Sequence, residues 1–135
     1  MIPIEEKAWC LLSETKGIGP RTLWGIADYL EKNHKSTAWF MQHPELIKVM
    51  MSGQASRLSM DNNSDLDAAE IEQLEKNKVG VIHPFHPDFP ERLKVLRKEF
   101  ALPAVLYTRG NVSLMNRPSI AIVGARNANE PAMAI

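Results

Sequence analysis

The sequence predicts an α+β protein in which a helical N-terminal part precedes a part with short strands. Apolar residues recur at helical spacing through the first third of the chain, whereas short apolar runs bounded by glycine or proline occur later, at 79–82, 104–107 and 120–123. A polar, turn-rich stretch at 59–65 separates the two patterns. We therefore predict two domains, at 1–65 and 66–135.

The N-terminal domain is predicted to begin with two helices joined by a glycine hairpin. Ala8, Trp9 and Leu12 share one face of a helix that ends near Thr15. A second helix has Pro20 in its first turn, where the missing N–H of proline costs no hydrogen bond. Its apolar face carries Leu23, Trp24, Ile26, Ala27 and Leu30.

Shorter elements follow the hairpin. Ser36 is predicted to cap a short helix, and another helix is predicted at 45–51. An amphipathic helix is expected at 67–77 and a short one at 91–100. The stretch between them contains a strand at 79–82 and then an irregular loop with three prolines, Pro84, Pro87 and Pro90.

Composition excludes several classes of site. The single cysteine, Cys10, excludes an internal disulfide and a multi-cysteine metal site, and it favours a reducing, cytoplasmic setting. No export signal is predicted, and no apolar stretch approaches the ~20 residues that span a bilayer, so no membrane partner is expected. The chain is neutral overall, but residues 1–70 carry a net charge of −3 and residues 71–135 a net charge of +3.

The hairpin between the first two helices is a candidate DNA-phosphate contact. In a helix-hairpin-helix motif, the amides at the start of the second helix face a phosphate, and here the contact would comprise Gly17, Ile18, Gly19 and Arg21. The alternative is that Gly-Ile-Gly is a compact turn in which Ile18 packs between the helices. Because this half is net acidic, the packing role is favoured.

The segment 118–127 predicts the opening of a phosphate- or nucleotide-binding domain. Its apolar residues at 120–123 predict a strand that is buried on both faces, as in a parallel sheet. Gly124 would then permit a tight turn, and Arg126 would offer two parallel hydrogen bonds to a phosphate. The dinucleotide pattern of three glycines is absent, because positions 126 and 129 are Arg and Asn. The chain ends soon afterwards, so we expect only the first part of such a domain.

Other polar and aromatic residues predict no further chemistry. His83, His86 and Asp88 fall within one loop, but the prolines beside them prevent a regular helical face, so solvated histidines are predicted rather than a metal site. The three tryptophans are predicted to be core residues. The sequence predicts no catalytic residues, no metal and no cofactor, and we expect a protein that is not an enzyme.

Four segments together resemble the DprA/Smf family of DNA-processing proteins in order and spacing. They are the Gly17-Ile-Gly-Pro hairpin, His86 to Leu93, Pro103 to Asn111, and Ile120 to Arg126. The resemblance implies a sterile-alpha-motif-like helical domain followed by an extended Rossmann-like domain that is truncated here. It also implies binding of single-stranded DNA and loading of the RecA recombinase during natural transformation of cells in the state of competence.

The resemblance assigns the DNA-phosphate turn to Gly124, Ala125, Arg126 and Asn127. Ala125 stands where the family usually has serine, which removes a hydroxyl donor but keeps the backbone amide and the arginine. Glu130 and Pro131 follow where the family commonly continues with a small residue, tyrosine and glycine. His86 and Phe89 also replace the family's usual aspartate and tyrosine.

Three functional hypotheses follow. The first is a fragment of a DprA-like protein whose DNA affinity is weak without the rest of the Rossmann-like domain. The second is a helical module that binds a protein partner, and the third is a fragment of a nucleotide-processing Rossmann enzyme. In each case we expect residues 71–135 to be marginally ordered alone, or to pair with a second copy in a homodimer, because a lone apolar strand exposes unpaired edges.

Overall fold

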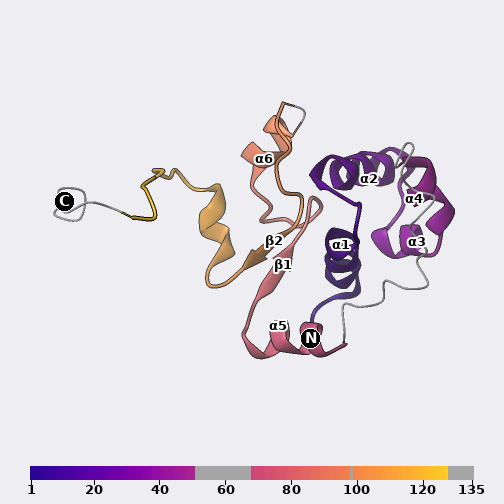
Figure 1. Ribbon diagram of the computed structural model, residues 1–135, viewed down its shortest axis with the longest axis horizontal. Helices are drawn as coiled ribbons and strands as arrows, with labels where there is room; N and C mark the ends of the chain where they lie inside the picture. Colours follow the sequence, from indigo (N-terminus) through magenta and orange to yellow (C-terminus); the bar gives the residue numbers. More distant parts are fainter. Residues whose placement is uncertain (51–67, 98, 128–135) are drawn as a thin grey trace.

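The structure is a computed structural model that describes residues 1–50, 68–97 and 99–127. Its elements, in chain order, are six α-helices, two β-strands and a 3₁₀ helix among the described residues. They are α1 (Ile4–Glu14), α2 (Pro20–Asn33), α3 (Thr37–Met41), α4 (Pro44–Met50), α5 (Ala68–Lys76), β1 (Gly80–Ile82), α6 (Glu91–Leu96), β2 (Leu106–Thr108) and η3 (Val112–Asn116). The α+β composition predicted from the sequence is confirmed (Figure 1). The predicted linker at 59–65 and residues 128–131 lie outside the described residues.

The predicted helical hairpin is present. α1 ends at Glu14, α2 begins at Pro20, and every apolar residue assigned to the core face of α2 is buried. Ser36 caps α3 as expected, since its hydroxyl accepts a hydrogen bond from the Trp39 amide at 3.0 Å. The Glu5 carboxylate of α1 also accepts a hydrogen bond from the Thr37 amide at 3.1 Å. A charged group of α1 thus pairs with an amide in the first turn of α3 that has no partner within its own helix.

β1 and β2 form a two-stranded antiparallel sheet in which Val81 lies opposite Tyr107. Both strands were predicted within two residues of their observed positions. α1 packs against β1, and Val81 and Ile82 are buried there. The Rossmann-like parallel arrangement that the resemblance implies is not seen among the described residues, whose strands run antiparallel.

One hydrophobic core joins parts of both predicted domains. Trp9, Ile26 and Phe40 from the helical part are buried in the same cluster as Phe89 and Ala104 from the second part. Two long-range hydrogen bonds add to it. The Trp24 indole donates to the Leu102 carbonyl at 2.8 Å, and the Ile2 amide donates to the Glu75 carboxylate at 2.8 Å. Whether the two parts fold as separate domains stays a prediction, but they share this core.

The predicted strand at 120–123 is not formed, and this expectation was wrong. The segment is irregular, and the side chains of Ile120, Ile122 and Val123 are 91%, 95% and 92% exposed. In Figure 1 this yellow part of the chain projects away from the helices and the sheet. A buried strand needs neighbouring strands for its backbone hydrogen bonds, and the described residues provide none beside it.

Candidate functional site

The hairpin between α1 and α2 is shaped by two glycines and a buried isoleucine. Gly17 has a φ of 92°, a left-handed conformation that favours glycine. Its neighbour Ile18 is buried in the core, and Gly19 is the N-cap of α2. The packing role that the sequence favoured is therefore confirmed. Contact of this hairpin with a phosphate stays a prediction, with the exposed Arg21 in the first turn of α2 as its charge.

Carboxylates lie close to Arg21. A cavity of about 370 Å³ beside α2 is lined by Arg21, Arg97, Asp28 and Glu99, among others. The Arg97 guanidinium forms an ion pair with Asp28 at 3.0 Å and lies over the Trp24 ring, 5.5 Å from its centroid. An anion in this cavity would meet two carboxylates as well as two guanidinium groups, so the surroundings of Arg21 are not a simple basic patch.

The second candidate, Gly124, Ala125, Arg126 and Asn127, lies in the projecting segment. All four residues are exposed. Gly124 has no left-handed φ, and the chain bends two residues later, at Arg126 and Asn127. Arg126 makes no hydrogen bond or ion pair with any residue that the structure describes. The structure does not bring this segment and the hairpin together (Figure 1).

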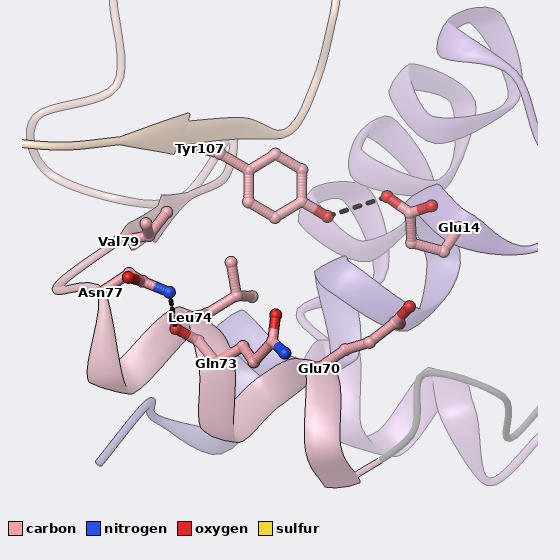
Figure 2. A pocket seen from close by; sticks show the side chains of 7 residues that line it. All are labelled: Glu14, Glu70, Gln73, Leu74, Asn77, Val79 and Tyr107. Carbon is pink, nitrogen blue, oxygen red and sulfur yellow. Dashed lines mark hydrogen bonds between the residues drawn. The ribbon is translucent and has the colours of Figure 1, made fainter.

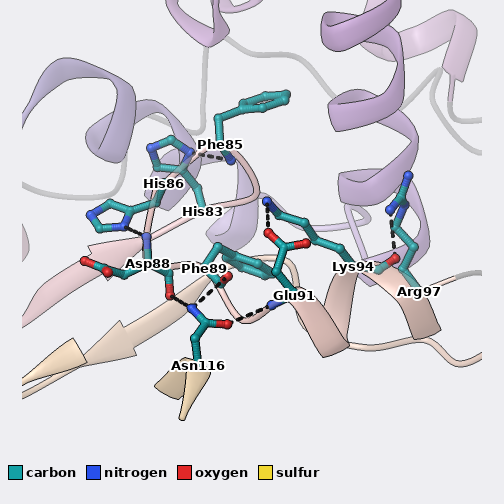
Figure 3. Close-up of polar contacts among 9 residues, drawn as sticks. All are labelled: His83, Phe85, His86, Asp88, Phe89, Glu91, Lys94, Arg97 and Asn116. Carbon is teal, nitrogen blue, oxygen red and sulfur yellow. Dashed lines mark hydrogen bonds and ion pairs between the residues drawn. The ribbon is translucent and has the colours of Figure 1, made fainter. Parts of the chain in front are cut away.

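The loop that follows β1 is tightly structured rather than solvated. The His83 ring is buried and lies parallel to the Trp9 ring, with centroids 5.9 Å apart. Its Nδ1 accepts a hydrogen bond from the Phe85 amide at 3.3 Å, and the His86 Nδ1 accepts from the Asp88 amide at 3.1 Å (Figure 3). The expectation of a solvated histidine is therefore wrong for His83, which packs against Trp9 of α1.

Burial has a strong effect on His83. It lowers the pKa of this imidazole from 6.5 to about 4; the nearby His86 adds to the shift and Glu5 opposes it. His83 is therefore neutral at physiological pH. Within the described ranges, no group of three or more His, Cys, Asp or Glu side chains could hold a metal ion. The ring stacking and the two hydrogen bonds of these histidines hold the loop in place.

Asn116 connects the end of η3 to this loop and to α6. Its Oδ1 accepts a hydrogen bond from the Glu91 amide at 3.1 Å, at the first residue of α6. Its Nδ2 donates to the Asp88 carbonyl at 3.2 Å, as Figure 3 shows. The side chain thus caps a helix from 25 residues further along the chain. Sequence reasoning missed this cap because capping signals are read from adjacent residues.

A second feature absent from the sequence prediction is a cavity of about 380 Å³ between α1, α5 and β2. Figure 2 shows its lining, which includes Glu14, Glu70, Leu74, Val79 and Tyr107. The Tyr107 hydroxyl donates to the Glu14 carboxylate at 3.0 Å. Burial raises the pKa of Tyr107 well above its usual range, so this hydroxyl stays protonated.

Comparison with known proteins relates the second part of the chain to a protein family. Residues 80–135 match the family model described as DNA recombination-mediator protein A, and the resemblance to the DprA/Smf family is confirmed over this part of the chain. No curated protein and no solved structure matches the chain. Among the described residues, no helix is both long and apolar enough to cross a membrane.

Proposed function

We propose that this chain serves DNA processing and recombination by binding single-stranded DNA, because residues 80–135 match the model of the DNA recombination-mediator protein A family. The observation that carries the proposal is the position of Gly124 to Asn127. These residues lie inside the matched part of the chain and are exposed to solvent. A nucleic-acid backbone can therefore approach them without rearrangement of the core.

The chemistry of this segment suits a phosphate. Arg126 has a planar guanidinium that can donate two parallel hydrogen bonds to phosphate oxygens, and Arg117 adds a second exposed charge to the same segment. Such contacts release counterions from the nucleic acid, so the affinity falls as salt rises. Without base-specific groups at the segment, binding would be independent of sequence.

Further parts of the proposal concern partners. We expect the bound single strand to be handed to the RecA recombinase, and we expect the chain to act as a binding protein without an enzymatic step. Pairing with a second copy would cover the exposed apolar residues at 120–123. A cytoplasmic location agrees with the single buried thiol, Cys10.

The test is fluorescence anisotropy with a labelled oligo-dT at low and at moderate salt. We expect Arg126→Ala to weaken binding about three- to tenfold and to reduce the salt dependence by about one phosphate contact. Lys76→Ala removes the same charge from the exposed end of α5 and is the matched control. Equal losses for the two variants would indicate unspecific attraction, and no binding at either salt would contradict the proposal.

The same assay decides the role of the hairpin. Arg21→Ala should leave binding unchanged if Gly17, Ile18 and Gly19 form a packing turn, which the burial of Ile18 favours. A loss comparable to that of Arg126→Ala would instead place a second phosphate contact at the start of α2. The carboxylates near Arg21 make the first outcome the expected one.

A further inference from the structure

The cavity between α1, α5 and β2 combines two features, a pair of carboxylates and an apolar wall. Its rim carries two carboxylates, Glu14 from the end of α1 and Glu70 from the first turn of α5. Its apolar wall is formed by Leu74 and Val79 together with the ring of Tyr107. Figure 2 shows the two carboxylates toward one end of the opening and the apolar groups toward the other.

The charges of the lining are unbalanced. Among the residues that the structure describes, those lining the cavity include no lysine, arginine or histidine to neutralise Glu14 and Glu70. Glu14 is engaged by the Tyr107 hydroxyl through one oxygen only, and a carboxylate can accept further hydrogen bonds. A cationic donor that enters from solvent would therefore find free acceptors on two sides.

The apolar wall restricts the kind of cation. A hydrated metal ion would gain nothing from Leu74 and Val79, whereas an alkyl chain would bury apolar surface against them. The Tyr107 ring adds a face that attracts an ammonium group. The volume of about 380 Å³ is large enough for a short amine and is at the lower end for small-molecule sites.

We propose that this cavity binds an alkylammonium group, with its charged end between Glu14 and Glu70 and its stem against Leu74, Val79 and Tyr107. The group can belong to a free aliphatic amine or to a lysine side chain of a partner protein, since both present the same chemistry. This site is independent of the DNA-binding proposal, because it uses neither the hairpin nor the segment at 124–127.

The test is a titration of the isotope-labelled full chain with n-butylammonium chloride, followed by NMR. We expect saturable shifts in the millimolar range for Asn77 and Tyr107, beyond those produced by the same concentration of sodium chloride. The uncharged 1-butanol should produce much smaller shifts. No saturable change, or equal shifts with 1-butanol, would overturn the proposal.

Charge variants locate the site. Glu70→Gln should weaken binding about two- to fivefold, the range of an exposed charge pair. Glu72→Gln removes an exposed carboxylate of the same helix that does not line the cavity, and it should leave the affinity unchanged. Glu14→Gln serves as a second variant. The proposal fails if Glu70→Gln and Glu14→Gln both bind as tightly as the original chain.

A final arm separates the two sources of the amine. Nα-acetyl-lysine methylamide carries the same ammonium and stem on a peptide backbone. Binding as tight as that of n-butylammonium would assign the site to a lysine side chain of a partner. Binding of n-butylammonium alone would assign it to a free amine, because the backbone would then obstruct entry.

Discussion

β1 and the segment at 120–123 have similar apolar sequences and opposite surroundings. Val81 and Ile82 are buried, since β2 supplies hydrogen bonds on one side and α1 covers one face. Ile122 and Val123 are almost fully exposed and have neither a paired strand nor a covering helix among the described residues. Branched apolar residues have a strand propensity in both places, but only the paired and covered strand forms and buries them.

The difference assigns separate roles to the two regions. The body of the protein comprises helices α1 to α4, the sheet and the loop at 83–90, which contribute side chains to one hydrophobic core. The segment from 117 onward leaves that body at Asn116 and exposes both its apolar residues and Arg126. Stability should therefore depend on the body, while affinity for a nucleic acid should depend on the segment.

The largest expected difference between the regions is in stability. Phe89 is fully buried and contacts the Trp24 ring edge-to-face, with centroids 5.6 Å apart. Phe89→Ala should reduce the free energy of unfolding by about 3–5 kcal/mol. Ile122→Ala should change it by less than about 0.5 kcal/mol, because its side chain makes no packed contact. Urea unfolding followed by tryptophan fluorescence measures the free energy of unfolding of both variants. Similar losses of stability in the two variants would contradict the difference between the regions.

A fall in pH is also expected to lower the stability of the body by a large amount. The pKa of His83 is lowered in the folded state, so its neutral form stabilises the body above pH 6.5, and this stability is lost as the pH falls toward about 4. The shift corresponds to about 3 kcal/mol. Urea unfolding at pH 7.5 and pH 4.5 should show this loss. His83→Asn should reduce this pH dependence, and an unchanged pH dependence in this variant would contradict the assignment to His83.

A smaller effect is expected where the two regions join. Asn116→Ala removes the acceptor for the Glu91 amide and the donor for two loop carbonyls, which should cost about 1–2 kcal/mol. Asn116→Asp keeps the acceptor at the start of α6 and should cost less. Thermal unfolding of both variants checks this order. If both variants cost the same, the donors rather than the helix cap would account for the stability.

The smallest free energy is expected for the local opening that lets the amides at 120–123 exchange with solvent. Amides at 120–123 should exchange with solvent at nearly the rate of an unfolded chain, because no backbone hydrogen bond of theirs is formed with the described residues. The backbone amides near Ile82, where β1 pairs with β2 at Leu106, should be protected from exchange with solvent. Strong protection of the Ile122 amide from exchange in a dilute monomer would show that the segment pairs with another strand. It would contradict the difference between the two regions.

Local signals in the sequence predicted most of the body. The i, i+3, i+4 spacing from Leu23 to Leu30 predicted α2 and its buried face, and Ser36 predicted the start of α3. The loop around His83 was predicted to be irregular but not to be buried. Its contact with Trp9 depends on a residue more than 70 positions away, and no local pattern reports such a contact.

The sequence by itself determined which residues form helices, where the glycine hairpin turns, and which family residues 80–135 match. Only the tertiary structure decided that Phe89 and Phe40 share one core, that Asn116 caps α6, and that Glu14 and Tyr107 meet at a cavity. The reason is physical. Periodicity and capping act over a few residues, whereas burial and long-range hydrogen bonds depend on which surfaces meet after the chain has folded.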